Sequence, residues 1–150
     1  MERYNKDTGH AIVEAARLDA LLRQLLLYAL PPMSNGFASD LFDNGALGTF
    51  SAKIDLARGM GLIDDTARSE LRAIKNIRNL FAHSEAPLCF TSPKVFEKVK
   101  KLPLWREEVT PRMVFDAAVH RMELAIDSKI DALRYEHATG QWHTQVTNSV

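Results

Sequence analysis

The chain has 150 residues, 46% of them hydrophobic, which is enough for one folded domain with a core of its own. Lysine plus arginine and aspartate plus glutamate each number 19, so the formal net charge is zero. A protein that binds nucleic acid alone usually carries a basic excess, so this composition excludes a globally basic binder and permits self-association.

The first part of the chain predicts one long helix and then a loop. Residues 1–8 are polar and are expected to form a flexible lead-in, with Thr8 as the N-cap of a helix over residues 9–30. Apolar residues recur at helical spacing along that helix, and two prolines end it. Residues 33–47 are rich in Ser, Asn, Gly and Asp, and this composition predicts a loop.

Two helices joined by a tight turn are expected next. Thr49 or Ser51 caps a short helix that runs to Met60, and the glycine that follows fits a left-handed helix end. Asp64 is the expected N-cap of the next helix, which runs to His83. Its apolar residues recur three or four positions apart, so this helix is predicted to be the central one.

The last third of the chain predicts two more helices. Ser-Pro at 92–93 and Thr-Pro at 110–111 are helix starts, with a capping hydroxyl before a proline. The first of these helices is short and basic, and the second is long and ends near Ala138. Residues 140–150 are expected to be a flexible tail.

These elements predict an all-α, single-domain bundle of four to five main helices over residues 9–139. The single Cys89 excludes an intrachain disulfide and a cysteine zinc motif, and the histidines lack metal-ligand spacing, so we expect neither metal nor cofactor. The longest apolar run is far shorter than a membrane span, and the N-terminus does not resemble a signal peptide. A cytoplasmic protein without membrane contact is expected.

The most informative residues lie at the end of the central helix. At about 100° per residue, Asn79 and His83 share a face with Arg72 and Lys75, and Arg78 lies beside them. Two interpretations stay open. Arg78 and Asn79 pair with backbone carbonyls or with acids of the first or last helix while His83 caps the helix, or these side chains form a site.

Four segments are informative in combination: LDALL (18–22), LGTFSAKIDLA (47–57), GLI (61–63) and IRNLFAHS (77–84). Together they resemble the mannitol operon repressor family (MtlR-like), over roughly residues 9–135. The resemblance implies an all-helical protein that represses a mannitol uptake and utilisation operon. It also implies a regulator with no recognisable DNA-binding motif, which acts through other regulatory proteins and has no catalytic residues.

The pattern Arg78-x4-His83 also resembles the motif of HEPN-domain ribonucleases, which are helical and usually act as dimers. That resemblance implies metal-independent cleavage of RNA. His83 would move a proton to or from the ribose 2′-OH or the leaving oxygen, Arg78 would hold the phosphate, and Asn79 would orient one of them. Glu85 stands where such nucleases often carry a tyrosine. A ribonuclease of this kind, or its inactive descendant, is the alternative to the regulator.

Direct reading of DNA by this chain is disfavoured. The two helices around Gly61 have the spacing of a helix-turn-helix, but the second begins with Asp64 and Asp65, which phosphates would repel. One local basic patch exists, and it fits either contact with nucleic acid or an acidic partner, or a solvated helix face. Its residues are Lys94, Lys98, Lys100 and Lys101.

Overall fold

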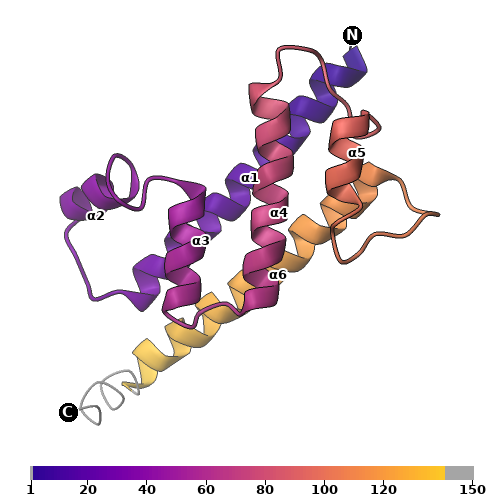
Figure 1. Ribbon diagram of the computed structural model, residues 1–150. Helices are drawn as coiled ribbons and strands as arrows, with labels where there is room; N and C mark the ends of the chain where they lie inside the picture. Colours follow the sequence, from indigo (N-terminus) through magenta and orange to yellow (C-terminus); the bar gives the residue numbers. More distant parts are fainter. Residues whose placement is uncertain (1, 141–150) are drawn as a thin grey trace.

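The computed structural model describes residues 2–140, and within that range the fold consists of six α-helices and no strand (Figure 1). The prediction of an all-α fold is confirmed, although there is one helix more than expected. None of the helices in this range has the length and apolar character that crossing a membrane requires. The helices are α1 (Glu2–Ala29), α2 (Asn35–Phe42), α3 (Phe50–Gly59), α4 (Asp65–His83), α5 (Pro93–Val99) and α6 (Pro111–Thr139).

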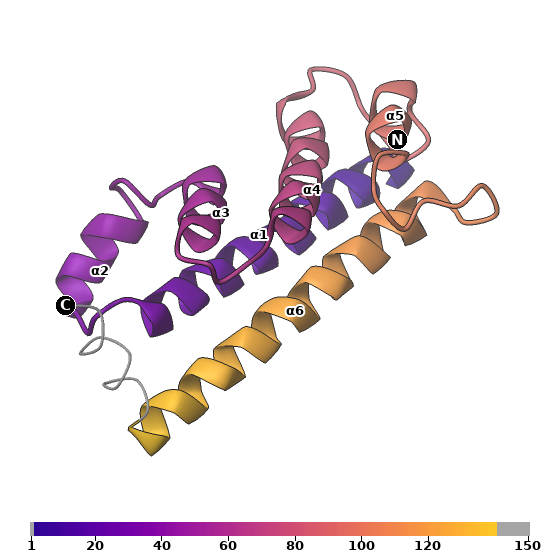
Figure 2. The ribbon, with the colours of Figure 1, turned by 60° about the horizontal axis from the view of Figure 1, so that its bottom comes forward.

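The helices form two layers. α1 and α6 lie side by side in one layer, and α3, α4 and α5 lie over one face of it (Figure 2). α1 and α6 run parallel. Two contacts show this, one near the beginnings of both helices and one near their ends. Near the beginning of both, His10 Nε2 lies 2.5 Å from Asp116 Oδ1. Near the end of both, Arg134 Nε donates a hydrogen bond to the Tyr28 hydroxyl at 3.0 Å.

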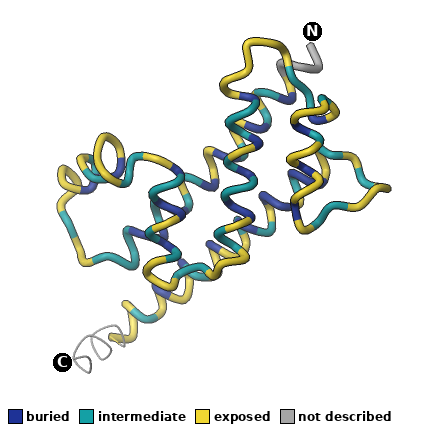
Figure 3. The backbone as a smooth tube through the Cα atoms, viewed as in Figure 1, coloured by how far each residue is buried: buried dark blue, intermediate teal, exposed yellow. Residues whose placement is uncertain are grey.

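The buried apolar residues of the helices form one core cluster, and Figure 3 marks these positions in dark blue along the helices. Near the beginnings of α1 and α6, the Phe90 ring lies 5.0 Å from the Phe81 ring and 5.2 Å from the Phe115 ring. Phe81 belongs to α4, Phe90 to the turn before α5, and Phe115 to α6. The three rings therefore connect these parts of the fold. The predicted apolar stripe of α4 is buried as expected, and it fixes the rotation of this helix. Its members are Leu71, Ile74, Ile77 and Phe81.

Local capping signals predicted several helix ends correctly. The side chains of Thr49, Asp64 and Thr110 each accept a hydrogen bond from a backbone N–H three residues later, at 3.1, 2.8 and 3.3 Å. Gly61 and Gly140 follow helices with φ of 71°, a left-handed backbone that suits glycine.

The predicted lead-in over residues 1–8 is wrong where the structure describes it, because α1 begins at Glu2 and not at Gly9. Asp7 anchors this first part of α1. Asp7 is 6% exposed, and its carboxylate accepts hydrogen bonds from the Phe90 backbone N–H and from Arg112, both at 3.2 Å. Both partners lie far along the chain, so the polar composition of this segment gave no sign of them. The predicted tail lies outside the described residues beyond Gly140.

The predicted loop over residues 33–47 contains α2, which is the second correction. Ser34 caps this helix by accepting a hydrogen bond from the Phe37 N–H at 3.2 Å. Phe42 is buried in the core, whereas Phe37 is 57% exposed. So short a helix, with few buried residues among Ser, Asn and Gly, gives little periodic signal.

Candidate functional site

A polar groove opens between the beginning of α3 and the end of α4. Its volume is about 330 Å³. The three side chains that the sequence analysis singled out, Arg78, Asn79 and His83, all lie in its wall. The structure therefore brings the predicted residues together in one open groove. The complete lining is Asp19, Gly48, Thr49, Phe50, Ser51, Lys75, Arg78, Asn79 and His83.

The two ends of the α3–α4 contact differ in charge balance. At the end far from the groove, Asp55 of α3 accepts hydrogen bonds from Arg68 at 3.0 Å and from Arg72 at 2.8 Å. Nearer the groove, Lys75 Nζ donates to the hydroxyl of Ser51 at 2.9 Å. α3 carries no acid between its first residue and Asp55. The cations of α4 that reach the groove therefore face no carboxylate on α3.

Among the described residues, Arg78 and His83 form no hydrogen bond or ion pair with another helix. Arg78 Nη1 donates to the side-chain oxygen of its neighbour Asn79 at 3.1 Å and forms no ion pair with any described residue. The exposed His83 imidazole has no hydrogen bond, ion pair or ring contact within residues 2–140. Ser84, with extended backbone, is the C-cap of α4. The alternative in which these side chains bond to acids and helix carbonyls is therefore not the arrangement found.

Asp19 of α1 is the one acid among the described lining residues, and its charge is already offset. Lys53 Nζ donates to Asp19 Oδ1 at 2.9 Å, and the side chains are 5% and 28% exposed. The charges of Lys75 and Arg78 are not offset in this way, so the groove is locally positive. The first turn of α3 adds the positive end of its helix dipole. A chain with zero net charge thus contains a groove suited to an anion such as a phosphate group.

Sequence reasoning assigned no part in a site to Asp19, Ser51 or Lys53. Which side chains of α1 and α3 face α4 depends on how the helices pair, and this cannot be read from periodicity along one helix. A signal was nevertheless present. Asp19 lies in the LDALL segment, and Ser51 and Lys53 lie in the LGTFSAKIDLA segment, both of which carry the family resemblance.

The lysine cluster lies away from the groove. α5 is on the opposite side of α4 from α3 (Figure 1), and no member of the cluster lines the groove. The four side chains are exposed, but Lys100 pairs with Glu97 at 3.1 Å and lies 4.9 Å above the Phe96 ring. The cluster is therefore partly neutralised and does not extend the positive groove. Its members are Lys94, Lys98, Lys100 and Lys101.

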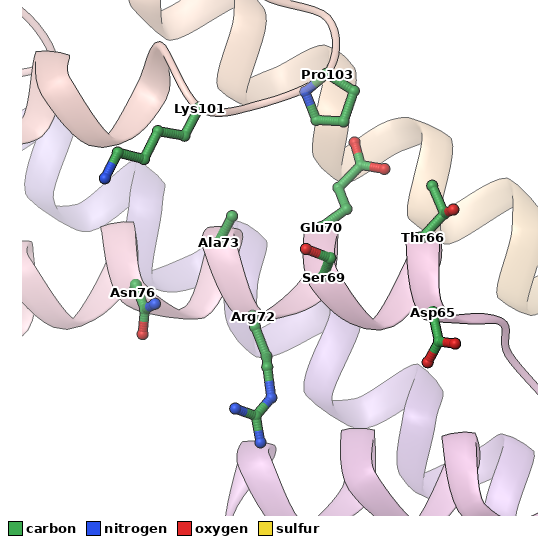
Figure 4. Close-up of a pocket in the computed structure, with 9 residues that line it drawn as sticks. All are labelled: Asp65, Thr66, Ser69, Glu70, Arg72, Ala73, Asn76, Lys101 and Pro103. Atoms are coloured by element: carbon green, nitrogen blue, oxygen red, sulfur yellow. The ribbon is translucent and has the colours of Figure 1, made fainter.

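A second cleft, of about 610 Å³, opens between α4 and the segment that follows α5 (Figure 4). Lys101 and Pro103 come from that segment, and the other side chains drawn in Figure 4 come from α4. The sequence analysis did not single out Glu70, which is 2% exposed in this wall. One of its carboxylate oxygens accepts a hydrogen bond from Arg121 of α6. We interpret Glu70 as a buried charge that ties α4 to α6.

Asp55 and the two arginines that bind it, Arg68 and Arg72, form what we call the Asp55 clamp. This clamp should make stability depend on pH in acid. The pKa of Asp55 is held below its ordinary value of 3.8 because Arg68 and Arg72 donate hydrogen bonds to the carboxylate. Stability from such a group is present above its unfolded pKa and is lost as the pH falls through the lower folded pKa. The free energy of unfolding should therefore fall as the pH drops below 3.8. Asp55→Asn should lose this part of the acid dependence.

Urea denaturation at a series of pH values checks this expectation. Asp40→Asn is the control, because it removes an exposed carboxylate of α2 that has no ion pair within the described residues. The control should keep the acid dependence of the parent. If Asp55→Asn also keeps it, the clamp does not act as described.

His83→Ala should change the free energy of unfolding by less than about 0.5 kcal/mol, because the imidazole has no hydrogen bond, ion pair or ring contact with the part of the chain that the structure describes. Thr49→Ala is the comparison. It removes a real N-cap and should lower stability by about 1 kcal/mol. Thermal and urea melts of both variants measure the difference. A loss of about 1 kcal/mol for His83→Ala would restore the capping interpretation.

Comparison with known proteins gave no match to a family model, to a curated protein or to a solved structure. The functional argument therefore rests on the groove and on the segments that form it.

Proposed function

We propose that this chain is a cytoplasmic transcriptional repressor, similar in action to the mannitol operon repressor family, that works through contacts with other proteins. One observation carries this proposal: segments of the resemblance that are distant in sequence meet at a single groove. Asp19 comes from the first segment, Ser51 from the second, and Arg78 and His83 from the last. Residues that share a functional surface are expected to converge in this way.

The surroundings of α4 support action through a partner. α4 contacts α1, α3, α5 and α6, so it is the central helix of the bundle and not a projecting one. A recognition helix must present its N-terminal residues to base edges, and α4 begins with Asp65 after the Asp64 cap. Arg68 and Arg72 are held by Asp55 and are not free for phosphates. These features favour repression without a DNA reader in this chain.

A mobility-shift experiment with promoter DNA of the mannitol operon tests the proposal. The pure protein should bind weakly, with little preference over scrambled DNA of the same length, and low salt should strengthen both complexes equally. Addition of cell extract should produce a complex specific to the promoter that contains this protein. Tight and specific binding by the pure protein at physiological salt would overturn the mechanism.

RNA cleavage is a second candidate, and a specific observation favours it: Arg78, Asn79 and His83, which has no partner among the described residues, line the same groove. In this reaction the ribose 2′-oxygen would attack the adjacent phosphorus and the bond to the 5′-oxygen would break. His83 would take the 2′-OH proton or give a proton to the leaving oxygen. Arg78 and Lys75 would stabilise the charge that builds on the phosphate. The products would be a 2′,3′-cyclic phosphate and a 5′-hydroxyl.

Incubation with RNA in the presence of EDTA tests this candidate. His83→Ala should reduce cleavage by about 10²–10⁴-fold, and Arg78→Ala should also reduce it strongly. His120→Ala is the matched control, because His120 is an exposed histidine of α6 outside the groove. No cleavage by the parent, or equal cleavage by all variants, would eliminate the ribonuclease.

A further inference from the structure

The hydrogen bonds within the groove between α3 and α4 use acceptors and leave donors. Lys75 Nζ donates to Ser51 Oγ at 2.9 Å, so the hydroxyl proton of Ser51 remains available for another acceptor. Arg78 Nη1 donates to Asn79 Oδ1 at 3.1 Å, so the amide N–H groups of Asn79 remain available in the same way. All four side chains line the groove. This part of the groove is therefore suited to a ligand that is rich in acceptors.

Further donors line the same wall. The ammonium of Lys75 and the guanidinium of Arg78 have N–H groups beyond those already bonded, and neither side chain is paired with a carboxylate among the described residues. The backbone N–H groups of Phe50 and Ser51 belong to the first turn of α3, so they have no partner within that helix. The imidazole of His83 adds one more N–H at the end of α4.

The number of charges and their arrangement favour one class of anion. Lys75 and Arg78 supply two positive charges that are not offset, and the donors come from two helices, α3 and α4. A phosphate monoester carries a charge of about −1.5 to −2 at neutral pH and has three terminal oxygens that accept hydrogen bonds. A carboxylate or a phosphodiester carries a single charge and has fewer terminal oxygens. The groove therefore matches a phosphate monoester better than either of these.

Asp19 indicates what the rest of the ligand is like. Its Oδ1 accepts a hydrogen bond from Lys53, but its Oδ2 has no hydrogen bond with any described residue. This carboxylate lines the groove and is 28% exposed, so it can accept a hydrogen bond from a ligand hydroxyl, whereas it would repel a second phosphate. The groove volume of about 330 Å³ is near the small end of the range for small-molecule sites, about 300–1,000 Å³.

We propose that this groove binds a small phosphate monoester that carries hydroxyl groups. Lys75, Arg78 and Ser51 hold the phosphate, and Asp19 accepts a hydrogen bond from a hydroxyl of the same ligand. The inference concerns binding in the groove, and it does not depend on whether the chain represses transcription or cleaves RNA.

Isothermal titration calorimetry of the full chain at about pH 8, where a monoester is fully ionised, is the first test. Glycerol phosphate, which has a monoester and hydroxyls, should bind most tightly. Ethyl phosphate is a monoester without hydroxyls and should bind about tenfold more weakly. Dimethyl phosphate is a singly charged diester and should bind more weakly still. Absence of glycerol phosphate binding, or a failure of either step in this order, would overturn the proposal.

Two variants test whether binding occurs at this groove. Lys75→Gln and Arg78→Gln should each weaken glycerol phosphate binding by about tenfold or more, because each removes a charged donor. Lys98→Gln is the matched control, since Lys98 is an exposed lysine of α5 outside the groove. The control should bind as tightly as the parent. Equal binding by all three variants would place the ligand elsewhere and overturn the proposal.

Amide NMR spectra of the parent locate the ligand without any substitution. Addition of glycerol phosphate should shift the backbone N–H signals of Phe50 and Ser51, which lie in the groove wall. The signals of α5 should stay in place. If the signals of Phe50 and Ser51 do not move while the ligand binds, the groove is not its site.

Discussion

Replacing Phe81 with alanine should lower the free energy of unfolding by about 3–5 kcal/mol. Phe81 is 4% exposed, and its ring lies 5.0 Å from that of Phe90, which in turn lies 5.2 Å from that of Phe115. Removal of the ring would leave a cavity where α4, α6 and the turn before α5 meet. It would also remove an aromatic contact worth about 0.5–1.5 kcal/mol beyond its buried area.

Urea denaturation monitored by circular dichroism measures this loss. Phe37→Ala is the matched control, because the same ring is removed from a position that is 57% exposed. The control should change stability by less than about 0.5 kcal/mol. If Phe81→Ala lowers stability by less than about 1 kcal/mol, the aromatic cluster does not hold the layers together as described.

Asp19→Ala should lower the free energy of unfolding by about 3 kcal/mol, because it leaves the Lys53 ammonium buried without a counter-charge. The Lys53 side chain is 5% exposed, and its Nζ donates to Asp19 Oδ1 at 2.9 Å. Asp19 itself is 28% exposed and keeps some contact with solvent. Most of the expected loss therefore arises from the stranded lysine and not from the removed carboxylate.

A double variant separates these causes. Asp19→Leu combined with Lys53→Met replaces the ion pair with apolar side chains of similar size, a change that is often neutral or stabilising in other buried pairs. The double variant should recover most of the stability that Asp19→Ala loses. If it remains as unstable as Asp19→Ala, the loss comes from altered packing at α1 and not from the unpaired ammonium.

Local signals in the sequence predicted most of the helix ends. Thr49, Asp64 and Thr110 cap helices through bonds to residues three positions away, so the sequence contains both partners within one turn. The early start of α1 depends on Asp7, whose partners Phe90 and Arg112 lie far along the chain. Such long-range contacts exist only once the fold has formed, and no local pattern indicates them.

The candidate site was predictable on α4 and not on its neighbours. Helical spacing placed Asn79 and His83 on one face with Arg72 and Lys75, and all of these except Arg72 line one groove. The groove also depends on what α3 and α1 bring to α4. Asp55 neutralises the arginines at one end of the α3–α4 contact, and Lys53 offsets Asp19 at the other. Both results follow from the way in which the three helices pair. Periodicity within each helix does not determine that pairing.

The parallel alignment of α1 and α6 has a consequence for how the chain folds during synthesis. Contacts such as that between His10 and Asp116 join residues 106 positions apart, and every other helix lies between them in sequence. Of the described helices, α1 leaves the ribosome before the others, and its longest neighbour, α6, is made after all of them. Contacts with so large a sequence separation slow folding, because closing so long a loop costs entropy before the contacts can offset it. The nascent chain therefore carries an apolar, half-covered α1 until α6 has been made, and chaperone binding should be greatest in this period.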